Sequence, residues 1–342
     1  MARDKADQNQ NINGSLSMTL HRIRITQRFA VTLALPIVIG GTLPLHAQDT
    51  PIVVGAPAPV AALWPVFVAQ TNGTFEEAGL DVTTRYVGGG QGLQQLVSND
   101  LQIFVTNPDQ PALAQDRGAP VQGFIGMINT PFSLLGAPGV TSFDDLQGKR
   151  IGTAAIASSD ATLISTMLLE NGLAKSEFEV FQTGSGSNKI AALLSGNVSA
   201  VTLTQPQDFI YLNSETTAVR LALSSDVVDS QAIAAFYNSN WADDNPEAVD
   251  AFVEAVREGK SFLLDEANRD AAIESLASSA NVAPEIAAEI YDFYLEESLF
   301  ETALELDLDM LDTYLDMARE AGIGDFETAS NYFVTTWSDA EE

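Results

Sequence analysis

The fold is decided by residues 52–109, which read IVVGAPAPVAALWPVFVAQTNGTFEEAGLDVTTRYVGGGQGLQQLVSNDLQIFVTNPD. The stretch begins with the apolar run Ile52–Val54, and its periodicity then predicts a helix, a strand, a second helix and a third strand. Turn residues separate these segments: the step Asn72-Gly73, the glycine loop Gly88–Gly90 and the polar corner Asn107–Asp109. Such a strand–helix–strand–helix–strand unit is typical of a parallel sheet covered by helices.

A second copy of this unit begins near Arg150. Its turn residues follow the same order as in the first copy: the step Asn171-Gly172, the glycine loop Gly184–Gly186 and the polar corner Gln205–Gln207. The two Asn-Gly steps lie about one hundred positions apart. Repeats dictate architecture, so we predict an α/β protein of two lobes, each a mostly parallel sheet flanked by helices, with a cleft between them.

Two extended stretches, 130–137 and 231–237, flank the second copy, and we interpret them as hinge crossovers. The expected organisation therefore places residues 48–130 and 237–342 in lobe 1 and residues 131–236 in lobe 2. Beyond the second crossover the pattern becomes helical only, with one apolar and one acidic face. The helices expected there are Pro246–Leu264, Asn268–Ala277, Pro284–Glu297, Leu306–Ala321 and Asp325–Phe333.

The length and composition limit which classes of protein this chain can belong to. The 342 residues are enough for about two domains at roughly 100–200 residues each, and a hydrophobic content of 46% allows large cores. The net charge of −30 repels nucleic acid and anionic membranes and favours solubility. We therefore expect a monomer with no nucleic-acid partner, and we interpret the acidic surface as solvated rather than as a docking face for a basic partner.

The N-terminus has the pattern of a targeting segment. The basic segment His21–Arg28 precedes the apolar segment Phe29–Leu45, which is too short and too interrupted to span a bilayer. We expect residues 1–47 to be a signal peptide that is cleaved after Ala47; Met18 remains an alternative start. The protein is then expected in the periplasm.

Removal of that segment changes the chemical inventory. His21 and His46 are the only histidines, and the chain has no cysteine. A mature chain that has neither histidine nor cysteine cannot form Cys/His zinc sites, histidine general bases, Ser-His-Asp triads or thiol nucleophiles. It also excludes a lipidated cysteine, so we expect a freely diffusing protein that is not lipid-anchored. We further expect no cofactor and no metal, and we expect that the protein is not an enzyme.

The candidate ligand site follows from the predicted sheets. Ligands of open parallel sheets bind outside the carboxyl ends of the strands, where glycines admit a ligand close to the backbone and helix N-termini supply donors. Because the two copies face one another, we expect the loops at these ends to converge on one cleft. These loops are Ala56–Val60, Gly88–Gly92, Asn107–Gln110, Ala154–Asp160, Gly184–Asn188 and Thr204–Asp208.

Particular side chains of these loops, and two nearby aromatic rings, are candidate ligand contacts. Tight turns, helix capping and core packing remain alternative interpretations for them. Lys189, directly after the loop Gly184–Asn188, is the only basic residue in or next to these loops, which weakens the case for a small anion. Neither glycine loop has the spacing of a nucleotide motif. The candidates are Pro57, Ala58, Pro59, Trp64, Gly90, Asn107, Asp109, Phe132, Ser158, Ser159, Asp160, Ser187, Gln205 and Gln207.

Five segments carry a family resemblance: Ile52–Gly55, Ala69–Gly73, Phe75–Val82, Leu146–Gly152 and Ala191–Val198. They resemble the nitrate/sulfonate/taurine-type substrate-binding proteins of ABC transporters, together with the related pyrimidine-binding branch of thiamine-precursor proteins. The resemblance covers nearly the whole mature chain. One departure is Ser199-Ala200, where the family commonly has Asp-Ala, and we expect it to cost a turn interaction rather than function.

The resemblance implies a type II periplasmic binding protein whose lobes close on a small solute and deliver it to a membrane permease. It also implies ligand contacts from the loops Pro57–Pro59, Asn107–Asp109, Ser158–Asp160 and Gln205–Gln207. We expect a sulfonate- or taurine-like solute, or a pyrimidine-like heterocycle. An enzyme related to the pyrimidine branch and a sensing receptor without transport are the alternative functions.

Overall fold

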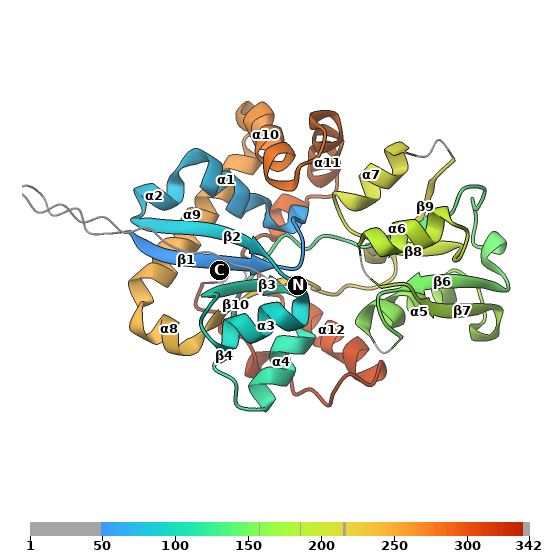
Figure 1. Cartoon of the computed structure of the whole chain (residues 1–342), viewed down its shortest axis with the longest axis horizontal. Coiled ribbons are helices and arrows are strands. Elements are labelled where there is room, and N and C mark those ends of the chain that lie inside the picture. Colours follow the sequence, from blue (N-terminus) through green and yellow to red (C-terminus); the bar gives the residue numbers. More distant parts are fainter. Residues whose placement is uncertain (1–48, 157, 185, 215–216, 338–342) are drawn as a thin grey trace, which may run out of the picture. The chain divides into compact units, whose positions relative to one another are not determined.

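The first sheet of the protein combines four strands from residues 50–126 with one strand from residues 234–238. The computed structural model describes residues 49–156, 158–184, 186–214 and 217–337, and within them this sheet has the strand order β2-β1-β3-β10-β4 (Figure 1). Strand β10 is antiparallel to both of its neighbours, so the other four strands run in one direction. The strands are β1 (Thr50–Ala56), β2 (Leu80–Tyr86), β3 (Ile103–Thr106), β4 (Val121–Gly126) and β10 (Ala234–Asn238).

The second sheet repeats this arrangement with the order β7-β6-β8-β5-β9. Its antiparallel strand is β5, and the other four strands again share one direction. The registers correspond as well, since Val54 pairs with Ile103 in the first sheet and Ile151 pairs with Ala200 in the second. The strands are β5 (Ser133–Gly136), β6 (Lys149–Thr153), β7 (Phe178–Gln182), β8 (Ala200–Leu203) and β9 (Val219–Leu223).

The chain passes between the two sheets twice. It leaves the first sheet after β4 and enters the second at β5, then leaves the second after β9 and returns at β10. The predicted extended stretches 130–137 and 231–237 begin in these passages and continue into β5 and β10. The predicted fold class, with two mostly parallel sheets and two crossovers, is therefore confirmed, whereas the exact lobe boundaries stay a prediction.

Helices cover both sheets, and the chain after β10 is helical, as expected. No helix in the described ranges is long and apolar enough to cross a bilayer. The helices are α1 (Trp64–Asn72), α2 (Thr74–Glu77), α3 (Gly89–Val97), α4 (Asp109–Asp116), α5 (Ser159–Glu170), α6 (Ser187–Leu194), α7 (Gln207–Ser214), α8 (Ser239–Asp244), α9 (Pro246–Leu264), α10 (Arg269–Ala280), α11 (Pro284–Glu296) and α12 (Leu308–Glu320).

One helix prediction is wrong. The segment Asp325–Phe333 contains only a short 3-10 turn at Ala329–Asn331. Tertiary contacts override the local pattern here: residue Phe333 pairs with Gly123 as a parallel β-bridge, and its ring lies 5.3 Å from the ring of Phe236. This segment therefore closes over the sheet instead of forming another helix.

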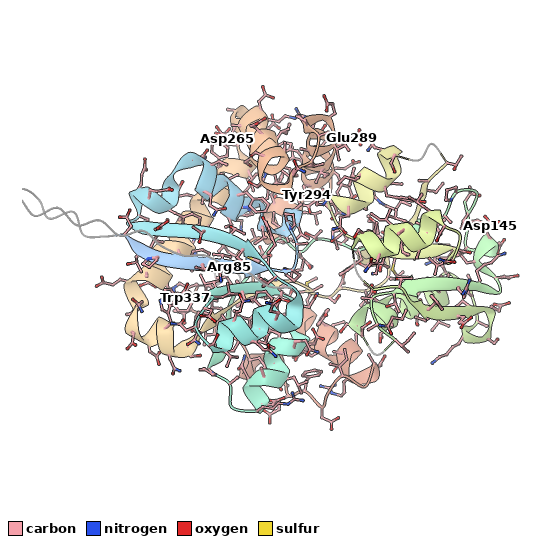
Figure 2. The ribbon with its side chains drawn as sticks, viewed as in Figure 1. Arg85, Asp145, Asp265, Glu289, Tyr294 and Trp337 are labelled. Carbon is pink, nitrogen blue, oxygen red and sulfur yellow. The ribbon has the colours of Figure 1, made fainter. Side chains whose placement is uncertain are left out.

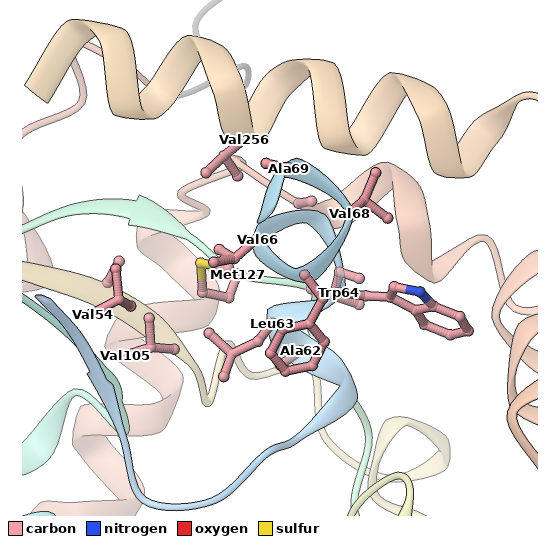
Figure 3. Packing of buried hydrophobic residues seen from close by; sticks show 14 of the residues in the cluster. Val54, Ala62, Leu63, Trp64, Val66, Val68, Ala69, Val105, Met127 and Val256 are labelled. Carbon is pink, nitrogen blue, oxygen red and sulfur yellow. The ribbon is translucent and has the colours of Figure 1, made fainter. Parts of the chain in front are cut away.

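Helix α1 shows how the sequence sets the core of the first sheet. Pro65 lies in its first turn, where the missing N–H costs nothing, and Gly73 ends it with a φ of 77°, which favours glycine. Residues 64–69 are all buried because α1 packs between the sheet and α9. Figure 3 shows Val66 and Ala69 of α1 below the long helix that carries Val256.

Helix α12 contacts the cores of both sheets. Leu311, Leu315 and Ala318 pack into a cluster with Phe104 and Phe236 of the first sheet. Met317, on the same helix, packs into the cluster of the second sheet, and α12 contacts α5 there. A helix from the C-terminal part of the chain therefore forms a wall that both sheets share.

Candidate functional site

A cavity of about 740 Å³ lies where strand ends from both sheets come together. Its walls come from residues that follow β1, β3, β6 and β8, and from the first turns of α3, α4, α5 and α6. These are carboxyl ends of parallel strands, where α/β sheets place their ligands. The two crossovers and α12 complete the walls.

The cavity brings together most of the residues that the sequence singles out. Residues from both copies of the repeat face the same space, as the convergence of the loops requires. The candidates that line it are Pro57, Ala58, Gly90, Asn107, Asp109, Phe132, Ser158, Ser159, Asp160, Ser187 and Gln207. The candidates outside its lining are Pro59, Trp64 and Gln205.

Trp64 is a core residue and does not face the cavity. Its ring is fully buried and lies edge-on to Tyr291, Tyr294 and Phe300, at centroid distances of 5.9, 5.7 and 5.3 Å. The indole N–H donates to the Ala272 carbonyl oxygen at 2.9 Å, so its polar atom is satisfied inside the protein. Trp64 therefore anchors α1 to the C-terminal helices and offers no face to a ligand.

Gln205 lies behind the cavity wall in a buried polar network. Its Nε2 donates to Asp208 Oδ2 at 2.6 Å, and its Oε1 accepts from the Tyr294 hydroxyl at 3.4 Å. Asp208 also accepts from Ser133 Oγ at 2.7 Å and from Arg220 Nη2 at 3.1 Å. Burial raises the pKa of Asp208 in spite of these donors.

This network lies at a contact between α7 and α11. The Arg220 guanidinium sits over the rings of Phe209 and Phe293, at 4.9 and 5.1 Å, and Phe293 belongs to α11. Asn213 on α7 donates to Glu289 on α11 at 2.9 Å; Figure 2 labels Glu289. Gln205 therefore supports the junction between the second sheet and the C-terminal helices.

The ion pair of Asp160 and Lys189 lies inside the second-sheet half of the cavity. Lys189 Nζ lies 2.8 Å from Asp160 Oδ2, with side-chain exposures of 6% and 13%. The other two ammonium protons reach the carbonyl and the hydroxyl of Thr202, at 3.1 and 3.0 Å. Burial would raise the pKa of Asp160, but the charge of Lys189 and the hydrogen bonds of Lys189, Thr202 and Ala154 outweigh it and lower that pKa.

The two serines before Asp160 have different roles. Ser158 caps α5, because its Oγ accepts from the Ala161 N–H at 3.2 Å, and it also donates to the Ala155 carbonyl oxygen at 2.6 Å. Ser159 Oγ is buried at the cavity wall, makes no close hydrogen bond within the described part of the chain, and has the Tyr314 hydroxyl as its polar neighbour. Capping accounts for Ser158, and Ser159 keeps its hydroxyl for another acceptor or donor.

Asp109 is the carboxylate that the first sheet presents to the cavity. It is 9% exposed, and its neighbours are neutral: the Tyr314 hydroxyl donates to Oδ1 at 3.5 Å and Gln110 Nε2 donates to Oδ2 at 3.3 Å. Burial raises its pKa because these long hydrogen bonds, together with those of the backbone N–H groups of Asp109 and Gln110, do not replace the lost water. The pKa of Tyr314 is raised well above its ordinary value, first by burial and then by the charge of Asp109.

The carboxylates and the helix termini of the cavity favour opposite ligand charges. Three carboxylates line it (Asp109, Asp160 and Asp229) against one ammonium group, that of Lys189, among the residues that the structure describes. Two unit charges about 4 Å apart interact by roughly 4 kcal/mol at an effective dielectric constant near 20. A helix N-terminus typically contributes about 0.3–1 kcal/mol, so an unpaired buried carboxylate outweighs it. Asp109 is that carboxylate, because Lys189 balances Asp160 and Asp229 is exposed.

The sequence pattern did not point to the residues that α12 contributes. Met310, Tyr314 and Met317 line the cavity, yet the C-terminal helices were expected only to pack on a lobe. A signal was present, because these three residues share one helical face beside the apolar face of Leu311 and Leu315. An apolar surface that wide exceeds what one packing contact buries.

Comparisons with known proteins agree with this fold. A family model described as NMT1/THI5 like matches residues 61–269. The ligand-binding component of an ABC-type import system from Staphylococcus aureus superposes with a TM-score of 0.70 at 10% identity, over 84% of this chain and 97% of that chain. The alkanesulfonate-binding protein from Xanthomonas axonopodis pv. citri gives a TM-score of 0.64 at 17% identity, over 85% of this chain and all of that chain (100%). At these identities the likeness shows the fold alone.

Curated relatives correct one expectation. A 4-amino-5-hydroxymethyl-2-methylpyrimidine phosphate synthase from Schizosaccharomyces pombe is 26% identical over 39% of this chain, and one from Saccharomyces cerevisiae is 21% identical over 58%. The chain spans 39% and 63% of these two relatives. The prediction that the protein is not an enzyme is therefore wrong, because the curated proteins it matches are named as enzymes. The lack of cysteine and of further histidines excluded particular chemistries, but it left carboxylates and an ammonium group in the cavity.

Proposed function

Since the chain belongs to the NMT1/THI5-like family and has the fold of periplasmic binding proteins, we propose that it is an extracytoplasmic solute receptor for an ABC-type importer. In this proposal a small organic solute enters the cavity, the two lobes close on it, and a membrane permease receives it. The expected signal peptide, residues 1–47, lies outside the described residues, and export through it is part of the proposal.

One observation carries this proposal: a single cavity has polar side chains from both sheets on its walls. Asp109 and Asn107 come from the first sheet, and Ser159 and Asp160 come from the second. A solute that contacts both sets binds a closed arrangement better than an open one, and this difference in affinity drives closure. A volume of about 740 Å³ is within the range of pockets that hold small organic ligands.

The two crossovers are the proposed hinges. Asn107 Nδ2 donates to the Ala232 carbonyl oxygen at 2.7 Å, and Ser224 Oγ accepts from the Phe132 N–H at 2.9 Å. Each bond ties a crossover residue to an element beside the cavity. A ligand that contacts these elements can therefore change the backbone of the crossovers and close the two lobes, without a mobile lid.

A thermal-shift screen of the purified chain tests the receptor proposal. Taurine, alkanesulfonates, nitrate, pyrimidines, amines and aromatic acids are the probes. A ligand at about 100 times its dissociation constant stabilises a protein by about 2.7 kcal/mol. A shift with one class, together with a permease gene beside this gene, supports the proposal. The absence of any shift and of any co-purified small molecule by native mass spectrometry contradicts it.

A pyrimidine phosphate synthase activity is the second candidate, and the names of the curated relatives favour it. Incubation of the purified chain with candidate precursors, followed by mass spectrometry of small-molecule products, tests this activity. Turnover that Asp109→Asn abolishes, in a variant that unfolds at a urea concentration no lower than that of the wild type, would place chemistry in this cavity. Binding without turnover would favour the receptor.

A further inference from the structure

We propose that the cavity selects a small organic molecule whose amine or amidine nitrogen donates hydrogen bonds to Asp109, and that it rejects sulfonate- and nitrate-type anions. This inference rests on the proposed function, because it names the class of solute for the same cavity. It follows from the charges around the cavity and from how each charge is already paired.

The first step is that Asp109 lacks a compensating charge. Its carboxylate is 9% exposed, and its two side-chain donors are Tyr314 at 3.5 Å and Gln110 at 3.3 Å, which are both neutral and distant. None of the ion pairs found in the described ranges includes it. A buried carboxylate without a cation is costly to maintain, and a bound cation removes that cost.

The second step is that Lys189, the cation in the described lining of the cavity, already pairs with groups of the protein. Lys189 uses its three N–H groups on Asp160 Oδ2 and on the two oxygens of Thr202. Arg220, which does not line the cavity, has its Nη2 on Asp208. An anionic solute would therefore have to break a buried ion pair or bind without a cation, and both are unfavourable.

The third step is that a second polar group lies near Asp109. Ser159 Oγ is buried at the cavity wall and makes no close hydrogen bond among the described residues, and its polar neighbour is the Tyr314 hydroxyl, which also contacts Asp109. Ser159 starts α5, whereas Asp109 starts α4 of the first sheet. A nitrogen head group on Asp109 that also reaches Ser159 would contact both sheets.

The N-termini of two helices favour a hydrogen-bond acceptor, whereas Asp109 favours a donor. Helices α3 and α6 begin at the cavity without a side-chain cap and without an acidic residue in the first turn. They suit an acceptor atom, such as a ring nitrogen or a carbonyl oxygen, at the far end of the solute. They supply partial charges only, so they orient the ligand while Asp109 sets its class.

The test uses matched probes that differ in the charge of the head group. Benzamidine and benzenesulfonate share a ring, ethylamine and ethanesulfonate share a chain, and 4-aminopyrimidine adds a heterocycle. The full chain is refolded from denaturant to remove any bound molecule, and thermal shifts and calorimetric dissociation constants are measured. The variants are Asp109→Asn and, as a control that removes one exposed acidic charge elsewhere, Asp81→Asn on β2.

We expect the amine, amidine or aminopyrimidine probes to stabilise the wild type and Asp81→Asn, and their dissociation constants to rise at least tenfold in Asp109→Asn. A shift with a sulfonate but with no nitrogen probe overturns this inference and leaves the receptor proposal standing. Equal affinity of a nitrogen probe for wild type and Asp109→Asn also overturns it. If no probe binds and native mass spectrometry finds no co-purified molecule, the receptor proposal fails and this inference fails with it.

Discussion

At the scale of single residues, the carboxylates of the cavity differ in what surrounds them. Asp160 has an ammonium partner and three further hydrogen-bond donors, whereas all donors to Asp109 are neutral: the Tyr314 and Gln110 side chains and the backbone N–H groups of Asp109 and Gln110. The pKa of Asp160 is lowered and that of Asp109 is raised. Asp160 is therefore paired inside the protein, whereas none of the ion pairs found in the described ranges includes Asp109.

Replacing Lys189 by methionine tests the role of the ion pair as part of the frame. The variant leaves Asp160 buried without its cation, and loss of one partner of a buried pair typically costs about 3–5 kcal/mol. We expect Lys189→Met to lower the free energy of unfolding by about 3 kcal/mol in urea titrations. Lys149→Met, at an exposed site on β6, should change it by less than about 0.5 kcal/mol.

A second substitution separates the ion pair from simple packing. Adding Asp160→Asn to Lys189→Met removes the unpaired charge, so the double variant should recover part of the lost stability. No recovery would mean that the lost hydrogen bonds from Lys189 to Thr202, and not the charge of Asp160, account for the loss.

The stability of the free protein should depend on pH through Asp109. Its folded pKa is raised above the unfolded value, so its contribution favours folding below the unfolded pKa and is lost as the pH rises through the folded pKa. Asp109→Asn should therefore gain stability relative to the wild type as the pH rises above about 4, the ordinary value for Asp. Tm values of both proteins between about pH 4 and 7 check this.

The same measurement distinguishes two roles for Asp109. If its carboxylate stabilised the fold, Asp109→Asn would lose stability as the pH rises, which is the opposite sign. Asp160 is an example of a carboxylate that stabilises the fold. Its folded pKa is lowered, so its contribution to the free energy of unfolding is present above the unfolded pKa and is lost as the pH falls through the folded pKa.

At the scale of elements, the packing of α1 against α9 holds the first sheet and the C-terminal helices together. Gly259 of α9 lies against the backbone of α1, and a Cβ there would lie 2.2 Å from the Pro65 carbonyl oxygen. Helix α9 has many apolar neighbours along its buried face, so the close approach is fixed by the packing of the whole helix.

Gly259→Ala tests this close approach. In an exposed helix the change stabilises by about 1 kcal/mol, but here it should destabilise by about 1–3 kcal/mol because backbone atoms must move. Urea unfolding measures the difference. Glu258→Ala, on the exposed side of the same helix, is the matched control and should leave stability nearly unchanged. Stabilisation by Gly259→Ala would show that α9 shifts easily.

Helix α12 packs against both sheets and also lines the cavity. Its side chains reach the clusters of both sheets, and it carries Tyr314 to Asp109. Its sequence predicts an amphipathic helix, and only the fold gives that helix two partners. The wall that it forms is therefore a property of the assembled elements.

At the scale of the whole molecule, the proposed function requires the two sheets to approach one another around a ligand. The chain has no cysteine, so two introduced cysteines can carry spin labels without competition. Asp81→Cys on β2 and Glu179→Cys on β7 place one label on an exposed site of each sheet. A stabilising probe from the screen should shorten and narrow the distance distribution between them.

That measurement has a clear opposite outcome. A probe that raises Tm but leaves the label distance unchanged would show binding without closure, and the hinge assignment of stretches 130–137 and 231–237 would then be wrong. A pair of labels within one sheet, at Asp81 and Gln122, is the control and should report no change.

The sequence by itself determined the duplicated α/β architecture, the two crossovers and the loops that meet at the cavity. These features follow from local periodicity and turn residues, such as Pro65 and Gly73 at the ends of α1, and local patterns are encoded within a few residues.

Only the tertiary structure decided which candidates face the cavity and how their charges are paired. Trp64 and Gln205 turned out to be buried behind its walls, Tyr314 arrived from a helix about two hundred positions from Asp109, and Lys189 was matched to Asp160 rather than to Asp109. Such pairings depend on contacts between distant segments, and the periodicity of one segment carries no information about the partner that another segment brings.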